Sequence, residues 1–200
     1  MAFLTRSFSF AACCPWQLFA YGVVRCRNIL VDNRNLVTGV FAPRLILPVS
    51  AVLAGVPDFG VAFVLLLGMM LYYGVSFSIS AVAAVPLVAL LVATSLAVGL
   101  FLSALNVRYR DVGYAVPFLT QLWFFVTPVA YPSSLVPERW RRMYELNPMA
   151  AVVGGFRWVL LSNREARGML SVASVASAVL MLLLGLIYFQ RAEQRFADVV

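Results

Sequence analysis

The chain contains no lysine and no histidine, so all fifteen of its basic residues are arginines, against eight acidic residues. Without lysine it cannot hold a phosphate-binding loop that ends in Gly-Lys-Ser/Thr, which excludes a standard ATPase. Without histidine it lacks the usual general base and the commonest metal ligand. Its three cysteines, Cys13, Cys14 and Cys26, do not have the paired spacing of a zinc site. These absences argue against most catalytic chemistry.

Charge is also missing over a long stretch, because residues 59–107 carry no charged side chain. A membrane span needs about 20 apolar residues, so this run holds two spans joined by a turn at 74–80, where glycine and serines interrupt the aliphatic residues. The alternative is a buried soluble hairpin, but some face of every element in a soluble protein meets water. A hydrophobic content of 63%, a charged content of 12% and a mean hydropathy of +0.93 agree with a membrane protein.

The apolar segments predict an all-α, polytopic membrane protein that forms one domain over residues 1–200. We expect about five transmembrane helices, near 7–24, 45–73, 77–105, 112–136 and 168–190. The arginines between them favour a cytoplasmic location for 25–44, for 106–111 and for the C-terminal tail. Six arginines between 138 and 167 fall on the opposite side, so arginine counting alone barely decides the orientation.

An apolar piece at 147–161 is too short to span a membrane comfortably and is interrupted by Gly154, Gly155 and Arg157. Segments of this length often enter the membrane and leave on the same side. Such a geometry must be covered by protein or face a water-filled cavity. Four prolines around the piece suit a broken path: Pro128, Pro132, Pro137 and Pro148. The sequence therefore predicts a re-entrant helical segment on the outer side, and with it a transport pathway.

Several blocks of sequence resemble one family. They are PWQLF at 15–19, NLVTGVFAPRLILPVSAVLAGVPDF at 35–59, LNVRYRDVGYAVPFLTQLWFFVTPVAYPSSLVPERW at 105–140, LNPMAAVVGGFRWVLL at 146–161 and RAEQRFADVV at 191–200. In this order they are similar to the membrane permease subunit of type-2 ABC exporters for polysaccharides such as O-antigen, capsule and teichoic acid. Members of that family usually begin with an amphipathic interfacial helix and a further span, which are missing here. A start codon assigned too late and a truncated copy are both open.

The connection at 25–44 interleaves charged and amide side chains with aliphatic ones. The resemblance implies a cytoplasmic interfacial helix that docks on an ATPase partner and receives its power stroke. The residues expected to carry this coupling are Asn28, Arg34, Asn35, Pro43 and Arg44. The alternative is an anchor that binds anionic head groups.

The turn that contains Arg108, Arg110 and Asp111 is expected at the cytoplasmic side. The resemblance places it near a mouth that admits a lipid pyrophosphate, and arginine suits phosphate through its bidentate fork. A membrane-boundary anchor explains these residues equally well.

Asp58 follows Arg44 by about 21 Å of helix, which puts it near mid-membrane. An acid there costs at least ~2.5 kcal/mol, so it is expected to face a protein interior, a partner or water. Structural pairing is favoured over a proton relay, because no second intramembrane acid or histidine accompanies it.

An aromatic-rich set is expected to line a channel and its outer gate. Aromatic faces stack on sugar rings with little sequence preference, although Trp and Tyr also collect at membrane interfaces regardless of function. The residues are Trp123, Phe124, Phe125, Tyr131, Asn147, Pro148, Phe156, Arg157 and Trp158.

The resemblance implies a transporter subunit rather than an enzyme, with no cofactor, metal or nucleic acid on this chain. It implies a homodimer in the plasma membrane that exports a lipid-linked polysaccharide, with a cytoplasmic C-terminus and a separate ABC ATPase subunit that holds ATP and magnesium. Alternatives are a type-2 ABC permease for a drug or another lipid, and a truncated, non-functional copy. An intramembrane enzyme acting on a polyprenyl-phosphate lipid is a further alternative, but such enzymes usually need clustered acids or histidines.

Overall fold

The computed structural model describes residues 2–33, 44–73, 84–109, 111–129, 146–161 and 172–199, together with Tyr131, Arg139 and Tyr144. Within these residues the chain is helical and contains no strand. The helices are α1 (Ala2–Asp32), α3 (Ile46–Leu53), α4 (Val56–Tyr72), α5 (Ala84–Arg108), α6 (Val112–Val126), α8 (Pro148–Leu161) and α10 (Val172–Val199). The predicted all-α fold is confirmed.

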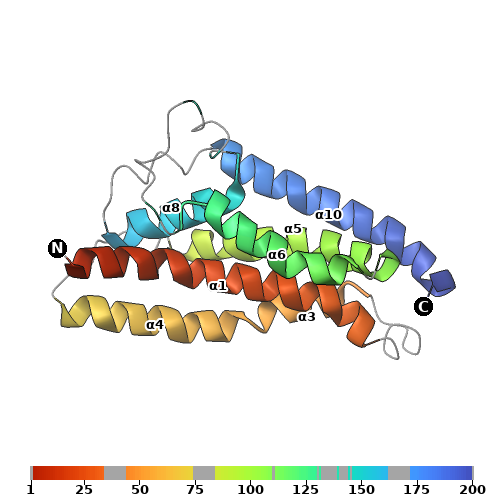
Figure 1. Ribbon diagram of the computed structural model, residues 1–200, viewed down its shortest axis with the longest axis horizontal. Coiled ribbons are helices and arrows are strands. Elements are labelled where there is room, and N and C mark those ends of the chain that lie inside the picture. The colour runs from red at the N-terminus through yellow and green to blue at the C-terminus, as the bar shows by residue number, and fades with distance from the viewer. Residues whose placement is uncertain are drawn as a thin grey trace.

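The helices form an elongated bundle in which α1 and α5 run in the same direction (Figure 1). Gly22 of α1 lies beside Ser95 of α5, and Cys26 lies beside Gly99. The α3–α4 segment and α6 run the opposite way. The last residues of α1, α5 and α10 therefore meet at one end of the bundle, which we call the Arg108 end. The helix ends that flank the three connections predicted on one side of the membrane all lie there.

Three of the described helical segments are long and apolar enough to cross a membrane: Ile46–Tyr72, Ala84–Arg108 and Val172–Glu193. The shorter apolar helices are α6 and α8. Large apolar side chains face outward along these segments, as at Val64 and Leu65, which are 66% and 65% exposed. A surface of this kind requires lipid or protein around it, so the polytopic membrane fold is confirmed.

The first helix is longer than the sequence predicts. α1 covers 31 residues and continues through Asp32, so residues 25–32 prolong it instead of beginning a separate interfacial helix. No glycine or proline stops the helix there, and Leu30 packs in a cluster with Leu100 and Phe189. The prediction of a separate helix is wrong for residues 25–32, and residues 34–43 lie outside the described part of the chain.

The segment predicted as one span over 45–73 is broken in the middle. α3 ends at Leu53, and α4 begins at Val56 with Pro57 in its first turn, where a missing backbone N–H costs nothing. At Gly55 an added Cβ would lie 2.8 Å from Leu18 and Tyr21 of α1, so the break is pressed closely against that helix. A new helix N-terminus is thereby created within the apolar segment.

The fourth predicted span, at 112–136, stops early as a helix. α6 ends at Val126, and Thr127 is extended with φ −89° and ψ 136°. The residue before a proline is pushed out of the helical region, and Pro128 follows directly. The chain therefore leaves α6 before it has spanned a full bilayer as helix.

Two glycines set the closest helix contacts around α5. A Cβ at Gly99 would lie 2.7 Å from the Sγ atom of Cys26 on α1, and a Cβ at Gly185 would lie 2.6 Å from the carbonyl oxygen of Ala97. Small residues at these points let the helix backbones approach each other, as helices do in membranes. α5 is thus the central element on which α1 and α10 both pack.

Candidate functional site at the junction of α6 and α8

The short helix α8 is almost entirely buried although it has only 14 residues. Met149, Ala150 and Val152 have no exposed surface, and Phe156 is 1% exposed. It packs against α1, α5 and α10 (Figure 1). An apolar piece too short to span a membrane must be covered by protein or face a water-filled cavity, and α8 is covered by protein. Its re-entrant path stays a prediction.

Asn147 joins the end of α6 to the beginning of α8. Its Oδ1 atom accepts hydrogen bonds from the indole nitrogen of Trp123 at 3.3 Å and from the backbone N–H of Met149 at 3.1 Å. Its Nδ2 atom donates to the Oγ1 atom of Thr127 at 3.1 Å. Acceptance from Met149 is the bond of a helix N-cap, which satisfies one of the free N–H groups of the first turn. One amide therefore both starts α8 and holds it to α6.

Arg157 makes the second link between the same elements. Its guanidinium donates to the carbonyl oxygen of Pro128 at 2.6 Å, of Val129 at 2.7 Å and of Tyr131 at 3.3 Å. The side chain is 3% exposed, so it lies within the protein and does not border an opening of this chain. These bonds satisfy carbonyls that α6 would otherwise leave unpaired beyond its last turn. The fork of the guanidinium fits several acceptors at once.

Some of the aromatic residues predicted to line a channel pack in the core of the bundle, and others do not. Trp123 stacks edge-on against Phe19 with ring centroids 5.2 Å apart, and Phe124 does the same against Trp16 at 5.4 Å. Phe156 meets the ring of Phe59 at 5.9 Å. These rings fill the bundle core, whereas Phe125 is 60% exposed. Pro148 is buried at the start of α8, and Trp158 is half-buried.

Tyr131 continues the junction beyond α6. Its hydroxyl group lies 2.9 Å from that of Tyr144 and donates to the carbonyl oxygen of Phe125 at 3.0 Å. The phenol therefore serves as a hydrogen-bonding group between the residues that follow α6 and Tyr144.

The residues predicted at the other side of the membrane lie at the Arg108 end. Arg44 donates to the carbonyl oxygen of Glu193 on α10 at 2.9 Å, and Asn28 lies near the end of α1. Arg108 is exposed, with its guanidinium 5.2 Å from the centroid of the Tyr109 ring, and Asp111 is exposed just before α6. Four predicted residues fall outside the described residues: Arg34, Asn35, Pro43 and Arg110.

Asp58 lies in the first turn of α4, directly after the helix break. The N–H groups of a helix N-terminus carry positive partial charge and favour an acidic side chain. The carboxyl group is exposed on the isolated chain. The sequence predicted the need for a polar environment, and the broken helix supplies part of it.

Asn106 makes a contact between helices that its place in the predicted connection at 106–111 does not reveal. It lies within α5, is 4% exposed, and donates to the backbone carbonyl oxygen of Arg27 on α1 at 3.1 Å. A Cβ at Gly113 would lie 3.0 Å from its Oδ1 atom, so the amide also packs against α6. The signal in the sequence was an amide near the end of the uncharged run at 59–107.

Among the described residues no group of three or more His, Cys, Asp or Glu side chains could hold a metal ion. The polar contacts described above fix helices relative to one another. The described residues therefore form a polytopic helical membrane protein whose buried polar groups hold its helices together.

Comparison with known proteins agrees with this class. Residues 18–161 match the family described as ABC-2 type transporter, and this chain belongs to that family. It is 33% identical over 196 residues to an O-antigen export system permease protein RfbA of Myxococcus xanthus, which covers 96% of this chain and 74% of that protein. It is 25% identical over 187 residues to an O-antigen export system permease protein RfbA of Klebsiella pneumoniae, covering 93% and 72%. The predicted family is confirmed.

Proposed function

We propose that this chain is the membrane subunit of an exporter that carries a lipid-linked polysaccharide, of the O-antigen, capsule or teichoic acid type, across the plasma membrane. The main support is the similarity to O-antigen export permeases, which extends over 96% of the chain. The apolar helices provide the membrane domain that such a subunit needs.

A separate ABC ATPase subunit would supply the energy, and ATP and magnesium would bind to that partner. Membership of the ABC-2 family supports such a partner in general. The Arg108 end is the surface we assign to it, with the C-terminus cytoplasmic. At this end Arg44 connects the start of α3 to the last turns of α10, so a force on the connection before α3 would reach α10 directly.

Two copies of the chain would form the conduit. Seven described helices, with α8 buried among the others, leave no room for a sugar-wide path inside one copy. A path between two copies needs no further element, and the exposed acid at Asp58 would gain partners or water in such an assembly.

Co-purification in detergent with the ABC ATPase encoded nearest to this chain is the test. We expect a stable complex with two copies of each subunit, and export of the polymer when both are expressed in cells that lack their own exporter. A complex that forms but hydrolyses ATP without exporting any polysaccharide would contradict the proposed cargo. Failure to form a complex would contradict the proposed partner.

Coupling can be tested separately at Arg34. Charge reversal by Arg34→Glu should abolish export while membrane insertion stays intact, because the connection before α3 is proposed to contact the ATPase. Arg139→Glu is the matched control, since Arg139 is exposed and far from this connection in the chain. Full export by the Arg34→Glu variant would overturn the assignment of this connection.

A further inference from the structure

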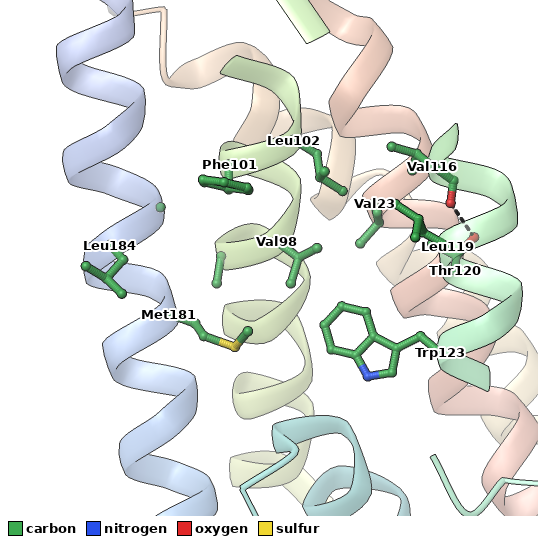
Figure 2. Close-up of a pocket in the computed structure, with 12 residues that line it drawn as sticks. Val23, Val98, Phe101, Leu102, Val116, Leu119, Thr120, Trp123, Met181 and Leu184 are labelled. Carbon is green, nitrogen blue, oxygen red and sulfur yellow. Dashed lines mark hydrogen bonds between the residues drawn. The ribbon is translucent and has the colours of Figure 1, made fainter. Parts of the chain in front are cut away.

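A groove of about 480 Å³ lies between α6 and α10, with α5 behind it. Figure 2 shows Leu119 and Trp123 of α6 on one side, Met181 and Leu184 of α10 on the other, and Val98 of α5 between them. The groove shares Trp123 with the junction of α6 and α8 but none of the residues that contact Arg44, and nothing in the proposed export step uses it.

The groove offers a ligand only hydrocarbon contacts. Among its lining side chains, the hydroxyl of Thr120 already donates to the carbonyl oxygens of Val116 and Pro117, at 3.1 and 2.8 Å. The indole N–H of Trp123 is used by Asn147. A dry apolar space of this kind binds apolar ligands. An occupant with its own hydrogen-bonding groups would leave them unpaired.

The groove is large enough for an acyl chain. A group the size of a water molecule takes up roughly 30 Å³, so the space in the groove accommodates a chain of many methylene groups. The charges beyond the groove then indicate which kind of hydrocarbon chain it binds.

Two of the helices that line the groove, α5 and α10, each carry an arginine beyond the lining residues. Arg108 follows the lining residue Phe101 by two helical turns on α5, and Arg191 follows Leu184 by the same interval on α10. Residues seven apart lie on nearly the same face of a helix, about 10 Å along its axis. Both arginines are exposed, and both lie toward the Arg108 end. Guanidinium groups at this distance from an apolar groove complement a lipid with an anionic head group.

The close contact of Gly185 with Ala97 limits how the groove can close. α10 already touches the backbone of α5 there, so it cannot move further toward α5. We propose that the groove binds one acyl chain of an anionic bilayer phospholipid, whose phosphate is held by Arg108 and Arg191.

The test measures lipid bound to the purified full chain in micelles that contain equal amounts of phosphatidylglycerol and phosphatidylcholine. Native mass spectrometry counts each lipid on the protein. We expect phosphatidylglycerol in excess. Arg108→Gln and Arg191→Gln should each lower its binding about fivefold, because each arginine near a head group contributes that much. Arg139→Gln, a change at another exposed arginine, should leave it unchanged.

A second pair of variants separates the groove from the general lipid surface. Leu119→Trp fills the groove from an exposed position and should remove the bound phosphatidylglycerol, whereas Leu122→Trp, on the same helix outside the lining, should not. Equal binding of the two lipids, or binding that survives Leu119→Trp, would overturn the proposal. A Leu119→Cys variant that forms a disulfide-linked dimer not seen with the parent chain would also overturn it, since a second copy would then occupy the groove.

Discussion

Arg157 of α8 donates a hydrogen bond of 2.6 Å to the backbone carbonyl oxygen of Pro128, just beyond the end of α6. With its bonds to the carbonyl oxygens of Val129 and Tyr131, this guanidinium links α8 to the residues that follow α6. Its removal leaves several buried acceptors without a donor, and that cost exceeds the value of the bonds themselves.

Arg157→Met should therefore lower the free energy of unfolding by about 3 kcal/mol or more. Thermal unfolding of the purified protein in detergent measures this loss. Arg157→Lys should recover only part of the stability, because an ammonium group cannot reach several carbonyls with a planar fork. Arg139→Met, at an exposed arginine, should change the unfolding temperature little, and a comparable loss there would show that the effect is not specific to the junction.

Two substitutions at Asn147 separate the role of its side-chain oxygen, which accepts hydrogen bonds, from that of its nitrogen, which donates one. Asn147→Leu should cost about 2 kcal/mol, since the N-cap of α8 and the partner of Trp123 are both lost. Asn147→Asp keeps the acceptor for both N–H groups, and the hydroxyl of Thr127 can turn to donate to it. The Asp variant should unfold closer to the parent chain. Equal losses in both variants would contradict the role of the Asn147 oxygen.

The contact of Gly99 with Cys26 predicts a compensating pair of substitutions. Gly99→Ala should destabilise the protein by about 1–3 kcal/mol, because the new methyl group would lie 2.7 Å from the Sγ atom and 2.8 Å from the Cβ atom of Cys26. Cys26→Gly in the same chain removes both atoms, so the double variant should be more stable than the sum of the single changes predicts. Gly68→Ala is the control, since nothing lies within 4 Å of its added Cβ, and it should stabilise α4 slightly. Additive losses at positions 26 and 99 would contradict the contact.

We expect the side chain of Asp58 to face a more polar environment than the apolar side chains on the same helix. In membranes, Asp58→Cys should react with a charged thiol reagent much faster than Val64→Cys, a matched exposed position on α4. The parent chain gives the baseline, because Cys26 is buried and Cys13 and Cys14 are half-buried. Equal protection of both positions would place the residue in lipid and contradict the expectation from its cost there.

Much of the fold could be predicted because long apolar runs in a sequence indicate membrane helices. The uncharged stretch from residue 59 to residue 107 becomes α4 and α5, and the final apolar segment becomes α10. The ends of the helices are harder to predict from the sequence. The sequence favours a stop after Val24, but α1 continues because Cys26 and Leu30 pack on α5, and no local pattern reveals a partner about 70 residues away.

The candidate site shows the same division. Asn147 and Arg157 stood out as polar residues in an apolar piece, so their importance was predictable. Their partners are mostly backbone carbonyls of residues 128, 129 and 131, which carry no side-chain signal. Asn106 was assigned to a turn because turn residues follow it directly, whereas its contact with Arg27 depends on two helices meeting side by side.

The contact between Gly185 and Ala97 lies at the midpoint of α10, which extends over 28 residues from Val172 to Val199. No side chain separates the two helices there, and beyond this contact Phe101 packs on Tyr188 with ring centroids 4.9 Å apart. α10 is therefore held to α5 along its length, and a displacement of the end that Arg44 holds at the Glu193 carbonyl would be shared by both helices. A methyl group at position 185 would force the two backbones apart and loosen this coupling.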